Sequence, residues 1–143
     1  MKKLFLLLIT FTLLNGQDSK LKITILDLDG SGLNSSILKA CFGRLESTLI
    51  NSGRFQVIEK NKREELLKEA EWQNSGACDT DCAVEIGSQI GADYIVFGSI
   101  TQLGRSFHQI DLKIVDIEEG EAVEAVTEDA KGDVEVLLNV MEE

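Results

Sequence analysis

The sequence has no proline and only one histidine, His108, among its 143 residues. The lack of proline argues against a proline-rich linker and against a cis-proline turn. A single histidine excludes a metal site built from several histidines. Basic side chains are also scarce, because 14 Lys and Arg stand against 25 Asp and Glu and give a formal net charge of -11. We therefore expect no nucleic-acid partner and no anionic membrane surface, since both would repel the chain.

Residues 1–16 have the pattern of a secretory signal peptide. Lys2 and Lys3 precede an apolar and threonine run of eleven residues, 4–14, after which the chain becomes polar. At about 1.5 Å per residue the run spans roughly 16 Å, about half of a bilayer core, which favours a cleaved signal over a retained anchor. We expect residues 17–143 to form a single domain that is periplasmic or secreted, with no direct membrane span after cleavage.

The hydrophobic pattern of the remaining chain predicts an α/β fold. Strand patterns occupy residues 21–28, 55–59, 94–100, 107–117 and 122–127. Helix patterns occupy residues 34–52, 61–72, 83–90 and 133–141, the second with a capping box and a charge run that we interpret as a solvated face. The resulting order is β-α-β-α-α-β-β-β-α. Because helices join the early strands and hairpins join the late ones, we expect one mixed sheet of about four to five strands with helices packed against it.

The turn after the first strand suggests a catalytic alternative. Residues 27–31, with the sequence DLDGS, resemble the first motif of the haloacid-dehalogenase phosphatases, in which one aspartate attacks phosphorus and both help to hold magnesium. A Mg-dependent phosphatase-like enzyme that uses Asp27 and Asp29 is therefore the alternative function. The sequence lacks the further acidic pair that this chemistry needs, so a structural turn is favoured. A calcium loop is disfavoured because Leu38 stands where a bidentate glutamate is required.

The cysteines and the histidine are each given a structural interpretation. Cys78 and Cys82 lie close together in a loop, and export would place them where thiols oxidise, so we predict a structural disulfide. A redox-active pair is the alternative, although such pairs usually have two intervening residues. Cys41 lies on an apolar helix face as a buried thiol, and His108 shares a strand face with Ile110. We predict no catalytic residue, no metal site and no cofactor.

Four phrases spread over residues 22–121 resemble the periplasmic domain of the CsgG-type family of curli assembly and transport proteins. They are ITILDLDGSGLNSS, SGRFQVIEKNKREELLKE, EIGSQIGADYIVFGSIT and LKIVDIEEGE. The family's turn into a strand with an inner glycine, and its Asp-x-x-x-Gly hairpin beginning at Asp116, both have matches here. The matching fold-signature residues are Gly91, Ala92, Asp93, Tyr94, Gly98 and Gly120.

The resemblance implies an exported, non-enzymatic domain that acts by binding other envelope or outer-membrane-associated proteins, with self-association as a further mode. The sequence has neither the membrane hairpins nor the lipidated amino terminus of curli channels, so we expect a short stand-alone member. Related domains occur in lipoprotein activators of cell-wall synthases and at the front of TolB-like proteins. We set both aside because we found no lipid cysteine and no propeller.

Overall fold

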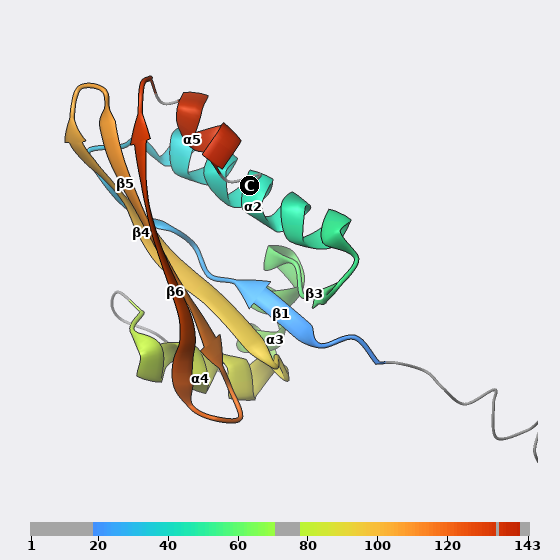
Figure 1. Ribbon diagram of the computed structural model, residues 1–143. Helices are drawn as coiled ribbons and strands as arrows, with labels where there is room; N and C mark the ends of the chain where they lie inside the picture. The colour runs from blue at the N-terminus through green and yellow to red at the C-terminus, as the bar shows by residue number, and fades with distance from the viewer. Residues whose placement is uncertain (1–18, 71–77, 134, 141–143) are drawn as a thin grey trace, which may run out of the picture.

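The computed structural model describes residues 19–70, 78–133 and 135–140. The expected signal peptide lies outside these residues. Helices cover both faces of one six-stranded sheet, with α2 and α5 on the same face (Figure 1). The strands are β1 (Lys22–Ile25), β2 (Asp29–Ser31), β3 (Gln56–Val57), β4 (Tyr94–Gly104), β5 (Phe107–Asp116) and β6 (Glu121–Lys131). The helices are α2 (Ser35–Ser52), α3 (Lys60–Glu69), α4 (Thr80–Ile90) and α5 (Glu135–Val140).

The sheet is mixed, which confirms the predicted fold class. Its order is β3-β1-β4-β5-β6, with β1 parallel to both β3 and β4, and with β4, β5 and β6 forming an antiparallel meander. The turn that we expected at residues 29–31 instead forms β2, which pairs in parallel with β4. The sequence DGS has little strand propensity, so it is the backbone pairing offered by β4 that keeps this segment extended.

Alternating residues of the central strands supply two cores. On one face Ile95 and Val115 pack with Ala83 and Ile86 of α4. On the other face, Val96 and its neighbours on β1 pack against the apolar side of α2. Because successive side chains of a strand point to opposite faces, a continuously apolar β4 is what two covered faces require.

Local sequence signals predict both ends of α2 and the end of α4 correctly, but they predict the start of α3 wrongly. The Asn34 side chain accepts a hydrogen bond from the backbone N–H of Ile37 at 3.0 Å, and α2 stops at Gly53 with φ 67°. Helix α4 stops in the same way at Gly91. Helix α3 begins at Lys60 and has no side-chain cap, so the expected capping box starting at residue 61 is wrong. It ends at Glu69, before residue 72, and residues 71–77 lie outside the described part of the chain.

Candidate functional site

The carboxylate of Asp27 lies at the end of β1 and is held by two cations from α3. Its Oδ1 accepts a hydrogen bond from Nη2 of Arg63 at 3.0 Å, and its Oδ2 lies 2.8 Å from Nζ of Lys60. Asp29 is exposed on β2 and takes part in neither contact. Both oxygens of Asp27 therefore serve to join α3 to the sheet. This arrangement gives no support to the phosphatase alternative, in which Asp27 would attack the substrate.

Arg63 is the charged residue that sequence reasoning placed wrongly. It is 4% exposed, although it lies in the charge run that we interpreted as a solvated face. Its Nη1 donates to the carbonyl oxygen of Ile25 and lies 3.4 Å from Oγ1 of Thr24. The Thr24 hydroxyl in turn donates to the carbonyl oxygen of Ile58 at 2.8 Å. One guanidinium thus connects β1, α3 and the Asp27 turn in the interior.

The ring of Phe42, on α2, completes this cluster. The Nζ of Lys60 lies 5.7 Å from its centroid and the Cζ of Arg63 lies 6.0 Å from it, both within the range of a cation–π interaction. A pocket of about 410 Å3 lies between Phe42 and the Asp27 turn, and one of about 270 Å3 lies on the Arg63 side of the turn. No group of three or more His, Cys, Asp or Glu within the described ranges is placed to hold a metal ion.

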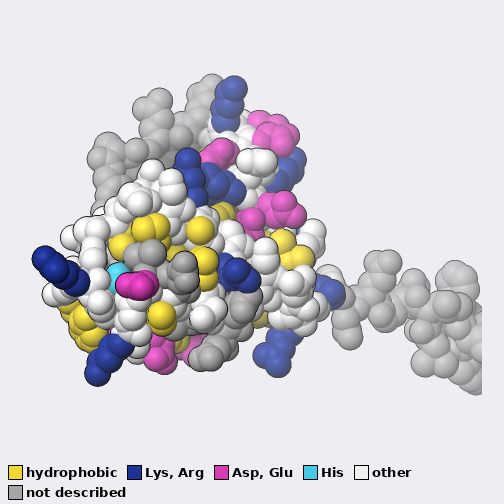
Figure 2. All heavy atoms as spheres, turned by 90° about the horizontal axis from the view of Figure 1, so that it is seen from above, with side chains coloured by type: hydrophobic (Ala, Val, Ile, Leu, Met, Phe, Trp, Pro, Cys, Tyr) yellow, Lys and Arg dark blue, Asp and Glu magenta, His cyan; other side chains and the backbone are white. Residues whose placement is uncertain are grey.

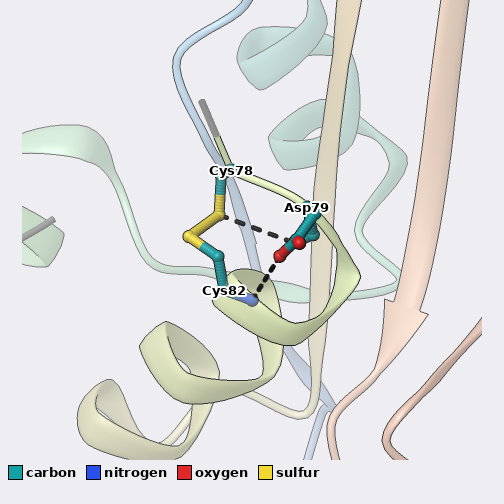
Figure 3. Close-up of a disulfide and its surroundings, with 3 residues drawn as sticks. All are labelled: Cys78, Asp79 and Cys82. Carbon is teal, nitrogen blue, oxygen red and sulfur yellow. Dashed lines mark hydrogen bonds between the residues drawn. A yellow bond between two sulfur atoms is a disulfide. The ribbon is translucent and has the colours of Figure 1, made fainter. Parts of the chain in front are cut away.

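A disulfide joins Cys78 to Cys82 at the beginning of α4 (Figure 3). Asp79, between them, is the N-cap of the helix, and its Oδ1 accepts a hydrogen bond from the backbone N–H of Cys82 at 2.9 Å. The bridge therefore ties Cys78, which lies just before the helix, to the first turn of α4. Its structural role, as opposed to a redox role, stays a prediction.

Cys41 and His108 are both fully buried. Burial raises the pKa of the Cys41 thiol, which suits the expected inert side chain rather than a nucleophile. His108 faces the same side of β5 as Ile110. Neither of its ring nitrogens has a hydrogen-bond partner among residues 19–70, 78–133 and 135–140.

The fold-signature residues lie at places where the backbone is constrained. Gly91 and Gly120 adopt positive φ values of 70° and 74°, at the end of α4 and in the β5–β6 turn. A Cβ added at Gly98 would overlap the backbone carbonyl oxygen of Asp111 on β5. The remaining three, Ala92, Asp93 and Tyr94, lead from α4 into β4. These are requirements of the fold, and a functional role for them stays a prediction.

Strand β6 is the least covered part of the sheet. Among the residues that the structure describes it pairs only with β5, and every side chain from residue 121 to residue 129 is exposed. It carries four acidic side chains, Glu121, Glu124, Glu128 and Asp129, and one basic side chain, Lys131. By contrast, the face of the molecule in Figure 2 carries basic and acidic side chains together. The sequence predicted a hairpin strand here but not its openness, although the absence of any apolar residue larger than valine was a signal.

The family model for LpoB, the peptidoglycan-synthase activator, matches residues 39–124. That span is more than half of the chain and runs from α2 into β6. The chain belongs to the LpoB family. No curated protein sequence was found to match the chain.

Solved structures of LpoB domains and of PelC share this fold at low sequence identity. The C-terminal domain of LpoB from Salmonella enterica has a TM-score of 0.64 at 13% identity, over 85% of this chain and 91% of that one. The same domain from Escherichia coli has a TM-score of 0.62 at 14% identity, over 82% and 87%. The PelC dodecamer from Paraburkholderia phytofirmans has a TM-score of 0.57 at 14% identity, over 87% and 81%. At such identities the likeness establishes the fold alone.

The resemblance to the CsgG-type family is wrong, because the family that matches is LpoB. The phrases that suggested it contain Gly91, Gly98 and Gly120. The backbone geometry of the fold requires these glycines, so they do not identify one family. The relation to activators of cell-wall synthases, which we set aside, is the one that holds. Curli assembly is therefore withdrawn as a function.

Membership in the LpoB family confirms that the protein is periplasmic or secreted, because peptidoglycan synthesis takes place outside the cytoplasmic membrane. The family description, an activator of synthases, also supports a non-enzymatic protein that acts in the cell envelope through contacts with other proteins. None of the described helices combines the length and the apolarity needed to cross a membrane.

Proposed function

We propose that this protein binds a peptidoglycan synthase in the periplasm and activates it. The observation that carries the proposal is the match of the LpoB family model to residues 39–124. That span includes α3 with the buried Arg63, the disulfide and the antiparallel pairing of β4 with β5. The family is defined as one of synthase activators, and the larger part of this domain belongs to the matched region.

Activation by such a domain needs no reactive side chain. A protein that only binds can accelerate an enzyme if it binds the active conformation more tightly than the resting one. A tenfold activation then corresponds to about 1.4 kcal/mol of differential binding, which a few well-placed contacts supply. A rigid platform favours this mechanism, and the contacts between Arg63, Asp27 and Thr24 hold α3 firmly to β1.

Self-association is a second mode of action, and one observation favours it. PelC, a protein of similar fold, forms a dodecamer. We propose that any oligomer of the present chain supports synthase binding, and sedimentation velocity over a range of concentrations tests whether such an oligomer forms. A single monomeric species at every concentration would remove this mode.

The decisive experiment adds the exported protein, purified from the periplasm, to a purified peptidoglycan synthase of the same organism. We expect the rate of glycan polymerisation from lipid-linked precursor to rise severalfold and to saturate with added protein. An unrelated acidic protein at the same concentration controls for charge and for surface adsorption. If neither the rate of any synthase of that organism nor its binding in surface plasmon resonance responds, the proposal is wrong.

A further inference from the structure

We infer that the open edge of β6 binds a basic, extended segment of a partner protein by strand addition. β6 is the last strand in the order β3-β1-β4-β5-β6, and its only strand partner in the described part of the chain is β5. It is eleven residues long, so the open edge is as long as any strand of the sheet. The inference stands whether or not that partner is the synthase.

The hydrogen-bonding pattern identifies the backbone groups that face outward. The N–H of Gly132 donates to the carbonyl oxygen of Ser106 at 2.9 Å. Gly132 therefore faces Ser106 as a hydrogen-bonded pair, next to the pair of Phe107 and Lys131. In an antiparallel ladder, hydrogen-bonded and non-hydrogen-bonded pairs alternate. Counting back along the regular register, the residues of β6 whose N–H and C=O groups point away from β5 are Ala125, Thr127, Asp129 and Lys131. They span about 20 Å of edge at 3.4 Å per residue.

A β-bulge sets the limit of this edge. The register of β5 against β6 shifts between Ile114 and Val115, so that Val123 has no residue opposite it. Bulges twist a strand and interrupt regular pairing. A partner strand therefore has a regular template only from Glu124 to Lys131.

The charge of the strand selects the chemistry of the partner. Within the described part of the chain, no ion pair involves Glu121, Glu124, Glu128 or Asp129. Glu124 and Glu128 flank Val126, which is 38% exposed, on one face of the ribbon. Opposite charges across a strand pair are stabilising and like charges are not. The fitting segment has Lys or Arg opposite the two glutamates and an apolar side chain between them.

A second copy of this chain is not the occupant. Pairing β6 with β6 would bring eight acidic side chains and two lysines into one ribbon, between two chains that each carry a net charge of -11. Exposed strand edges are normally blocked against such pairing, often by charge. Here the acidic side chains repel identical copies, and the same charges attract a basic strand.

The test measures, by fluorescence anisotropy, the binding of a fluorescein-labelled peptide of the length of β6 that has Lys, Val and Lys at alternate positions, so that they face Glu124, Val126 and Glu128. A peptide with N-methyl groups on the amides of its bonding edge is the control for strand pairing, and the same peptide with Glu in place of each Lys is the control for charge. We expect the N-methylated peptide to bind about tenfold more weakly or worse, the loss of roughly one or two hydrogen bonds. In hydrogen exchange, the backbone amides of Ala125, Thr127 and Asp129 should become protected by the unmodified peptide only.

Two variants locate the site on β6. Ala125→Pro removes one outward N–H and leaves the ladder with β5 intact, and we expect it to weaken binding about tenfold. Ala125→Ser keeps that N–H and should change binding by less than about twofold. Equal binding of the N-methylated peptide, or unchanged binding by a folded Ala125→Pro variant, would overturn the inference. If Ala125→Pro does not fold, the comparison of the two peptides on the unmodified protein decides the question alone.

Discussion

The two edges of the sheet treat charged residues in opposite ways. At one edge β3 has only two residues, and α3, which follows it, turns Arg63 inward against the next strand, β1, where its guanidinium contacts three residues. At the other edge β6 is long, and its four acidic side chains lie in solvent. A buried charge must be paired, so it links elements and stabilises the fold. An exposed, unpaired charge adds little stability and remains available to a partner. The first edge therefore serves folding, and the second serves binding.

The largest expected effect is at the β3 side. Arg63→Met would leave the carbonyl oxygen of Ile25 and the hydroxyl of Thr24 without their donor in the interior. We expect a loss of about 3 kcal/mol in the free energy of unfolding, below the upper range for broken buried pairs because Asp27 can be hydrated. Urea unfolding followed by circular dichroism measures it. Lys60→Met is the matched control and should cost less than about 1 kcal/mol, since that ion pair is partly exposed. Equal losses in the two variants would contradict the contrast.

The disulfide should contribute next in size, because it fixes the start of a helix that packs on the same side as α3. We expect Cys78→Ser with Cys82→Ser to lower the free energy of unfolding by about 2 kcal/mol. Differential scanning calorimetry of the two proteins, each with and without reductant, makes the measurement. Reductant should affect only the unmodified protein. Rapid reduction by millimolar glutathione would instead favour the redox alternative.

Proline placed at each edge compares the two directly. The N–H of Gln56 on β3 donates to the carbonyl oxygen of Leu21 at 2.9 Å, so Gln56→Pro loses a sheet hydrogen bond. We expect a cost of about 1.5 kcal/mol there and less than about 0.5 kcal/mol for Ala125→Pro on β6. Chemical denaturation of both variants gives the two values. A larger cost at Ala125 would mean that its N–H is used within the fold.

The smallest effect on stability is expected for a variant of β6 that should also change whether the protein forms dimers. Glu124→Thr with Glu128→Thr should alter the free energy of unfolding by less than about 0.5 kcal/mol, because both side chains are exposed and unpaired within the described residues. It should also allow β6 to pair with β6, which sedimentation velocity would detect as dimers. Adding Ala125→Pro should restore the monomer. A double variant that stays monomeric at high concentration would show that the charges of Glu124 and Glu128 are not what prevents β6 from pairing with β6.

Local signals in the sequence were enough for part of this structure. Asn34, Gly53 and Gly91 marked helix ends correctly, because a cap depends on neighbours within a few residues. The burial of Arg63 depends on Thr24, 39 residues earlier, and no feature of the charged segment around Arg63 predicts that contact. The openness of β6 depends on which elements fail to cover it, a property of the whole fold.

The error about family has the same origin. Phrases such as GADYIVFG describe a helix stop, a turn and a central strand, so they carry information about the fold. They carry little about the surface, on which families of one fold differ. The fold class was therefore predictable from these residues, and the family required a comparison over residues 39–124.

The position of β1 has a practical consequence for the limits of this module. β1 lies between β3 and β4, yet residues 22–25 precede the region that matches the family model. A fragment cut to residues 39–124 would lack the strand that pairs in parallel with both β3 and β4, together with the buried Ile23 and Ile25. The smallest piece able to fold is thus larger than the piece that is recognisable, and truncation studies should begin upstream of Lys22.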